Sequence, residues 1–207
     1  TDSLELTDPT CIVVSKKDVE PVPQQVDLPT ETDIPQQEIP SVEEPIRHFD
    51  AEVGIQPNDT YESNGYIYKT DEQGRIISAS GELRLDDHHV RDPDAQLAAG
   101  GDDRALTDDG GHLIGARFGG SPGLENMVAE NSFINRSQFK RYENAWARDL
   151  EAGNRVLVDI EPYYGVDGER PTHITGSYTV IRPDGSSFKD HFSFTNEDLR
   201  APEFQDD

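Results

Sequence analysis

The sequence predicts an α+β protein in which an antiparallel sheet carries few helices and follows an extended, acidic, proline-rich tail. Three observations lead to this prediction. Prolines recur every few residues between residues 21 and 40, short apolar runs bounded by glycine-containing turns follow, and one long amphipathic stripe lies among these runs. Hydrophobic residues make up only 33% of the chain, which is low for a fully compact protein and leaves part of it outside any core.

The predicted tail spans residues 1–55, and the predicted domain spans residues 56–207. Prolines at this spacing exclude a helix and remove the backbone donors that a strand ladder needs. We therefore interpret the tail as an extended linker. Two alternatives stay open for it. One is a proline-rich docking motif, and the other is a strand or helix that packs against the domain, with residues 11–14 apolar enough for a short strand. Cys11 is the only cysteine, so an internal disulfide and a cysteine-rich zinc site are both excluded.

The first part of the domain favours a hairpin followed by a loop. Residues 66–70 and 75–79 are strand-forming runs on either side of residues 71–74, which contain a turn glycine. Residues 81–85 extend the second strand. Residues 92–109 are polar and rich in glycine and aspartate, so we expect a loop there.

The second part of the domain favours one helix and a further sheet. Residues 137–151 carry a single apolar stripe at helical spacing, made of Phe139, Tyr142, Trp146 and Leu150. Gly153 follows as a helix stop signal. Apolar residues alternate from 156 to 160, and residues 174–181 and 187–194 flank a Pro-Asp-Gly sequence that is typical of a hairpin turn.

The net charge of −24 argues at first against nucleic acid, because binding a phosphate backbone needs Lys and Arg. The balance reverses between residues 112 and 148, where the basic side chains are Arg117, Arg136, Lys140, Arg141 and Arg148. A basic island in an acidic chain is compatible with a cleft that faces phosphate. The chain has no run of about 18 apolar residues, so we expect no membrane-spanning helix.

His112 is the first candidate for chemistry. It follows two glycines and enters a short apolar run, which presents an imidazole at the end of a strand. Histidine is the side chain best suited to accept a proton near neutral pH. Taken alone, the alternative that this histidine is structural stays open.

Asn135 and Glu143 are the next candidates. The Asn135 carboxamide offers a hard oxygen suited to Mg²⁺, and its alternative role is to cap the helix that follows. Glu143 lies eight residues further, about 12 Å along a helix axis. That separation favours contact with the same ion through a bound water, because Mg²⁺ usually keeps several waters. The alternative for Glu143 is an exposed carboxylate paired with Lys140.

These residues together resemble the DNA/RNA non-specific endonuclease family, whose members carry a ββα-metal active site. Residues 109–112 are similar to the family motif Asp-Arg-Gly-His, and Asn126, Asn135 and Glu143 follow at the intervals of the family. The resemblance covers roughly residues 61–194. It looks closest to the branch that forms C-terminal toxin modules of secreted bacterial polymorphic toxins.

One position departs from the family motif. Gly110 stands where better-known members carry arginine, so that side chain makes no phosphate contact here. Arg117 and Arg136 are the two candidates for substrate binding in its place, and the sequence does not choose between them.

The resemblance implies Mg²⁺-dependent hydrolysis of phosphodiester bonds in DNA, with RNA as a second substrate and Mn²⁺ as a substitute ion. In this scheme His112 takes a proton from the attacking water, Asn135 holds the ion, and Glu143 orders the ion's water shell. Asn126 holds either a loop or a metal-bound water. Asp109 either orients His112 or braces a turn as an Asx residue.

The resemblance also implies a cellular role. The chain is expected to be the toxin module of a secreted antibacterial effector, delivered into target bacterial cells and neutralised in its producer by an immunity protein. The alternatives are a non-toxin secreted or competence nuclease, and a catalytically inactive binding module of the same fold. Zinc is not expected, because the spacing of His88, His89 and His173 matches no common ligand set, and His191 is interpreted as a strand residue.

Overall fold

The computed structural model describes residues 46–88 and 90–197. The predicted tail up to residue 45, including the alternative strand at residues 11–14, lies outside these residues. Strand β1 (Arg47–His48) pairs in parallel with β2, and the Phe49 amide donates to the Glu62 carbonyl at 2.8 Å. Strand pairing therefore begins before residue 56, where the sequence analysis set the domain boundary.

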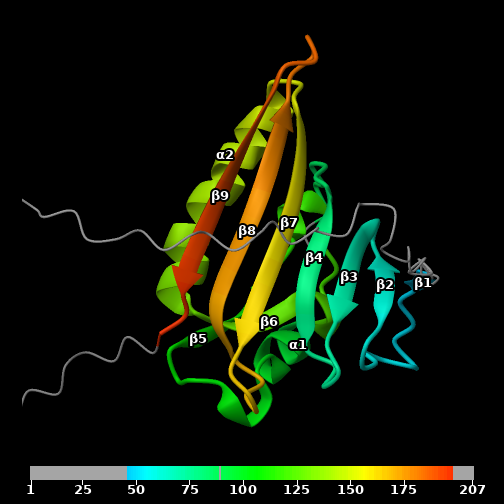
Figure 1. Ribbon diagram of the computed structural model, residues 1–207, viewed down its shortest axis with the longest axis vertical. Coiled ribbons are helices and arrows are strands. Elements are labelled where there is room, and N and C mark those ends of the chain that lie inside the picture. Colours follow the sequence, from blue (N-terminus) through cyan, green and yellow to red (C-terminus); the bar gives the residue numbers. More distant parts are fainter. Residues whose placement is uncertain (1–45, 89, 198–207) are drawn as a thin grey trace, which may run out of the picture. The chain divides into compact units, whose positions relative to one another are not determined.

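A seven-stranded sheet forms the larger part of the described residues, with the order β1-β2-β3-β4-β7-β8-β9 (Figure 1). All its pairings after β1–β2 are antiparallel. The remaining strands are β2 (Thr60–Ser63), β3 (Tyr66–Thr70), β4 (Ile76–Glu82), β7 (Arg155–Tyr164), β8 (Pro171–Ile181) and β9 (Ser187–Thr195). Both predicted hairpins and the alternating run at 156–160 are confirmed. The extension of the second strand ends at Glu82 rather than at residue 85.

Two further strands lie outside the seven-stranded sheet and form a separate ribbon. Strand β5 (Asp108–His112) pairs antiparallel with β6 (Met127–Asn131), so that His112 lies opposite Met127. Every residue of β6 is buried. The loop between the two strands contains short helical turns, η2 (Ala116–Phe118) and η3 (Leu124–Asn126).

The predicted helix is confirmed, although its start differs. Helix α2 (Lys140–Glu151) is preceded by a π-helical turn, η4 (Ile134–Phe139). No sequence period marks a π turn, which explains why the prediction placed the start at residue 137. The Asn131 carboxamide oxygen accepts from the Phe133 amide at 3.0 Å, so Asn131, and not Asn135, bonds the first turn of this segment.

The apolar stripe of α2 faces the large sheet. Figure 1 shows the helix lying behind β8 and β9. Trp146 is 2% exposed, and its ring lies 6.0 Å from that of Phe192 on β9. Tyr142 lies closer, 4.9 Å from the same ring. Burial of aromatic faces of this size is the main stabilising contribution at this contact.

A short helix interrupts the segment that was expected to be a loop. Helix α1 (Pro93–Ala98) begins at Asp92, whose carboxylate accepts from the amides of Asp94 and Ala95 at 3.0 and 3.1 Å. Aspartate at the N-cap with proline at the next position is a helix start signal. The prediction of a loop at residues 92–109 was wrong at this helix, because the prediction relied on the glycine and aspartate content of the segment and not on this local start signal.

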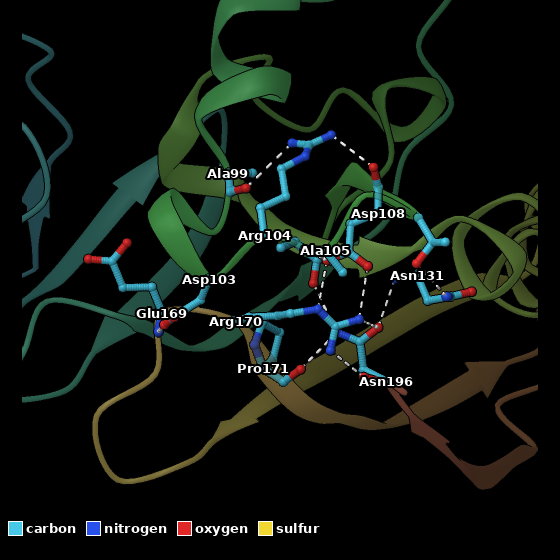
Figure 2. Close-up of polar contacts among 12 residues, drawn as sticks. Ala99, Asp103, Arg104, Ala105, Asp108, Asn131, Glu169, Arg170, Pro171 and Asn196 are labelled. Atoms are coloured by element: carbon cyan, nitrogen blue, oxygen red, sulfur yellow. Dashed lines mark hydrogen bonds and ion pairs between the residues drawn. The ribbon is translucent and has the colours of Figure 1, made fainter. Parts of the chain in front are cut away.

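A buried ion pair joins the ribbon to the large sheet (Figure 2). The guanidinium group of Arg170 donates to both carboxylate oxygens of Asp108, at 2.6 and 2.8 Å. The Asp108 side chain is 0% exposed and the Arg170 side chain 15%. Asn196 extends the link by donating to the Ala129 carbonyl and accepting from the Asn131 amide. These contacts fix β5 and β6 against the end of the sheet.

Candidate active site

A cavity of about 970 Å³ opens beside the ribbon, between α1 and the start of α2. Six of the seven predicted site residues line it, and they are Asp109, His112, Arg117, Asn135, Arg136 and Glu143. They come from β5, the loop after it, η4 and α2, so a strand, a loop and a helix converge on one space. The seventh, Asn126, does not line the cavity.

His112 is the last residue of β5 and stands at the cavity wall. Its Nε2 atom is buried without a hydrogen-bond partner in the described part of the chain. Burial first, and the charge of Arg91 second, lower the pKa of His112 to about 4. The imidazole is therefore neutral at pH 7, which is the form that accepts a proton.

Asp109 holds two neighbouring side chains of the site. Its Oδ2 accepts from Asn135 Nδ2 at 2.9 Å, and its two oxygens accept from Arg136 at 2.7 and 2.6 Å. Burial raises the pKa of Asp109, but the hydrogen bonds from Arg136 and Asn135 outweigh it, so this pKa lies below its ordinary value. Among the described residues, Asp109 orients Asn135 and not His112. These contacts match neither role that the sequence suggested, which were the orientation of His112 and the bracing of a turn.

Glu143 lies in a recess and is 9% exposed. Its Oε2 accepts from Lys140 Nζ at 2.9 Å, so the pair that the sequence suggested does form, but the carboxylate is buried. A Cβ atom at Gly115 would meet Glu143 Oε1, so glycine at this position leaves room for the carboxylate where it stands. Glycine at this position therefore lets a carboxylate approach the β5–β6 loop.

Asn126 holds a loop, one of the two roles left open for it. It is fully buried, and its carboxamide bonds the Ile114 amide at 2.9 Å, the Ile114 carbonyl at 2.9 Å and the Ser121 carbonyl at 2.8 Å. These three hydrogen bonds use its donor and acceptor groups on the segment that follows His112. Asn126 thus positions the backbone beside the cavity and does not reach into it.

Both arginines proposed for phosphate contact already bond other side chains of the protein. Arg117 donates to the Asn144 side chain at 2.7 Å, and Arg136 bonds Asp109. The cavity also contains two arginines that were not predicted from the sequence, Arg91 and Arg104. The start signal of α1 at Asp92 would have placed Arg91 at a helix entrance rather than in an unstructured loop.

Within residues 46–88 and 90–197, no cluster of three or more His, Cys, Asp or Glu side chains is arranged to hold a metal ion. The oxygen donors at the cavity are nevertheless of the type that Mg²⁺ prefers. The Asn135 carboxamide uses its nitrogen on Asp109, which leaves its oxygen for an ion. The recessed Glu143 carboxylate, with Gly115 clearing the space beside it, supplies a negative charge. The residues present therefore fit an ion with few protein ligands.

Glu130 is a buried carboxyl group that the sequence analysis did not single out. It lies on β6 opposite Asp109, is 2% exposed, and its Oε1 has no hydrogen-bond partner among the described residues. Burial, followed by the charges of Glu143 and Asp109, raises the pKa of Glu130 to about 8. The group is therefore mostly protonated at neutral pH.

Comparison with known proteins identifies the family of this chain. A model of the DNA/RNA non-specific endonuclease family matches residues 57–180, which include every residue of the site named above. The chain belongs to this family. Its members are metal-dependent nucleases, so the reaction of this endonuclease is the hydrolysis of phosphodiester bonds.

Two curated relatives resemble the endonuclease over part of their length. The Type VII secretion system protein EssD of Staphylococcus aureus (strain USA300) is 37% identical over 126 residues, which are 56% of this chain and 20% of EssD. The probable deoxyribonuclease RhsA of Dickeya dadantii (strain 3937) is 40% identical over 70 residues, which are 33% of this chain and 5% of RhsA. The chain thus matches a small part of each relative.

Two solved structures resemble the endonuclease more distantly. A crystal structure of the EndoG/EndoGI complex aligns with a TM-score of 0.47 and 14% identity over 69% of this chain and 76% of the other. An extracellular endonuclease aligns with a TM-score of 0.41 and 18% identity over 73% of this chain and 78% of the other.

No helix in the described residues is long and apolar enough to cross a membrane.

Proposed function

We propose that this endonuclease cleaves DNA, and RNA as a second substrate, without sequence preference and with Mg²⁺ as its ion. The observation that carries the proposal is the meeting of a neutral His112, whose Nε2 has no hydrogen-bond partner among the described residues, with Asn135 and Glu143 at one cavity. A general base and two oxygen donors at one cavity are what metal-assisted phosphodiester hydrolysis needs.

His112 acts first in the proposed reaction. Its neutral Nε2 accepts a proton from a water molecule, whose oxygen bonds to the phosphorus in line with the leaving 3′ oxygen. The bond from phosphorus to the 3′ oxygen breaks, and the 3′ oxygen takes a proton from solvent. Asn135 and Glu143 would hold the ion, which when bound offsets the negative charge that builds on the phosphate oxygens. Asp109 keeps the Asn135 carboxamide turned so that its oxygen is available. Contacts aimed at phosphate groups carry no base information, which accounts for the absence of sequence preference.

Digestion of plasmid DNA tests the chemistry. We expect the full chain to cleave with Mg²⁺, with weaker support from Mn²⁺, and to lose cleavage on addition of EDTA. His112→Ala should lower the rate about 10²- to 10⁴-fold, the range for loss of a general base. His191→Ala is the matched control, because His191 is exposed on β9 and lines no part of the cavity. Undiminished cleavage by His112→Ala would rule out the assignment of the base.

We also propose that the chain is the toxin module of a secreted antibacterial effector, with an immunity protein in the producing cell. The similarity to part of EssD, a secretion system protein, and to part of RhsA, a probable deoxyribonuclease, supports this proposal. A secreted nuclease without toxin function is the second candidate. A catalytically inactive module is disfavoured by the intact set His112, Asn135 and Glu143.

Expression of the chain in bacterial cells separates these roles. A toxin should kill the cells, His112→Ala should spare them, and co-expression of a small protein encoded beside the toxin should restore growth. Survival of cells that express the active wild-type chain in their cytoplasm would contradict the toxin role.

A further inference from the structure

Basic side chains line the cavity, but most of them bond acceptors of the protein and are not free to bind the substrate phosphate. Its wall carries five basic residues, which are Arg91, Arg104, Arg117, Arg136 and Lys140, and five acidic ones, which are Asp86, Asp87, Asp109, Glu143 and Glu151. In a chain of net charge −24, an anionic substrate approaches against a negative field. Binding therefore depends on a cation that is not already neutralised by the protein.

Four of the five basic side chains are committed to protein acceptors. Arg136 bonds Asp109, and Lys140 pairs with Glu143. Arg117 donates to Asn144 and lies over the ring of Phe118. Arg104 donates to the Gln96 carbonyl at the end of α1 and to the Asp108 carbonyl at 2.9 Å, and Figure 2 shows the second of these bonds.

Position 110 cannot supply the cation. A Cβ atom at Gly110 would collide with the backbone of Gln96 on α1, and backbone atoms do not move aside as a flexible side chain does. Helix α1 thus covers the place where the family motif carries arginine. The same helix contributes Pro93, Gln96 and Leu97 to the cavity wall.

Arg91 is the remaining basic side chain. It stands one residue before Asp92, the N-cap of α1, and so directly precedes the helix that excludes a side chain at position 110. Arg91 is exposed and lines the cavity, and it has no hydrogen bond or ion pair among residues 46–88 and 90–197. Its charge acts on His112, which agrees with a guanidinium group placed near the base.

We propose that Arg91 is the side chain that binds the substrate phosphate beside His112, in place of the arginine that α1 excludes from position 110. The inference rests on the proposed nuclease reaction and adds to it a substrate-binding residue from a different element. A guanidinium group suits this task, because it offers several donors in a planar fork to phosphate oxygens.

The test compares Arg91→Gln and Arg91→Lys with Arg182→Gln, a control in the β8–β9 turn that lines no part of the cavity. Cleavage of a DNA duplex is measured with Mg²⁺ over a range of substrate and salt concentrations. Binding of the same duplex is measured in EDTA with each substitution in the His112→Ala chain. We expect Arg91→Gln to weaken binding and to raise KM about 10- to 100-fold, the range for loss of a charged hydrogen bond.

Two further readouts separate phosphate binding from a structural role. The log–log salt slope of binding should become shallower by about 0.9 in Arg91→Gln, which corresponds to one lost phosphate contact. Arg91→Lys should recover part of the affinity, and the thermal midpoint of all variants should match the wild type. Unchanged binding, KM and salt slope in Arg91→Gln, with cleavage by the wild type intact, would overturn the inference. A wild-type chain that does not cleave at all would instead overturn the proposed function.

Discussion

The large sheet and the β5–β6 ribbon bury polar groups in different ways. In the sheet, buried and exposed residues alternate along β7. Two buried atoms of the sheet and its helix α2 have no hydrogen-bond partner in the described residues, and these are Tyr68 Oη on β3 and Trp146 Nε1 on α2. Both groups stay neutral. The indole of Trp146 does not ionise, and burial raises the pKa of Tyr68 well above its ordinary value. In the ribbon, the corresponding atoms are His112 Nε2 and Glu130 Oε1, which belong to groups that titrate.

This difference separates stability from chemistry. The sheet and α2 gain free energy by burying apolar and aromatic surface. The ribbon holds two ionisable groups in their neutral forms, which costs stability where water would favour the charged form. Such a ribbon stays in place only if other contacts hold it, and the ion pair of Arg170 with Asp108 is the strongest candidate. Four predictions test this division, from the largest expected effect to the smallest.

Removal of the anchor should have the largest effect. Arg170→Met leaves the carboxylate of Asp108 buried without its partner, and we expect a loss of about 3–5 kcal/mol in the free energy of unfolding. Urea denaturation measures it. Arg155→Met is the matched control, because its pair with Glu82 is exposed and should contribute almost nothing. Equal effects of the two substitutions would show that the ribbon does not depend on this anchor.

Removal of the buried acid should stabilise the protein. The folded pKa of Glu130 is raised to about 8 from 4.5, so the unfolded chain binds fewer protons and stability falls as pH rises between these values. Glu130→Gln removes this penalty, with an expected gain on the order of 2–4 kcal/mol at pH 9 and little change below pH 4.5. Denaturation in EDTA over this pH range measures it. A gain that does not depend on pH would contradict the assignment.

Substitution at the contact of α1 with the ribbon should cost less. Gly110→Ala places a methyl group against the backbone of Gln96, and we expect a loss of roughly 1–3 kcal/mol from overpacking. Gly165→Ala is the control, because its Cβ meets nothing within 4 Å. Thermal unfolding compares them. A Gly110→Ala chain as stable as the control would mean that α1 does not close this position.

The protonation of His112 should give the smallest effect. Its folded pKa is lowered to about 4 from 6.5, so the stability that its neutral form contributes is full above pH 6.5 and is lost as pH falls toward 4. The full shift corresponds to about 3 kcal/mol, and because water reaches the half-buried imidazole we expect a loss of roughly 1–2 kcal/mol over this range that is absent in His112→Ala. Titration of the imidazole by NMR measures the pKa directly. A midpoint near 6.5 would show that the ribbon does not bury this group.

The sequence predicted most elements because their signals are local. The stripe from Phe139 to Leu150 predicted α2, and strand alternation with turn residues predicted both hairpins. The start of α1 was also signalled locally, by Asp92 and Pro93, but was interpreted as loop. The π-helical turn at Ile134–Phe139 had no such signal in the sequence.

The sequence by itself determined the family and six of the residues that meet at the cavity, because the spacing of His112, Asn135 and Glu143 is a one-dimensional property. Only the tertiary structure decided what those residues contact. Asn126 turned inward to the β5–β6 loop, Arg117 and Arg136 were taken up by protein acceptors, and Arg91 was left facing the cavity. The physical reason is that burial and hydrogen bonding join residues far apart in the chain, such as Asp108 and Arg170, and no local pattern records those pairings.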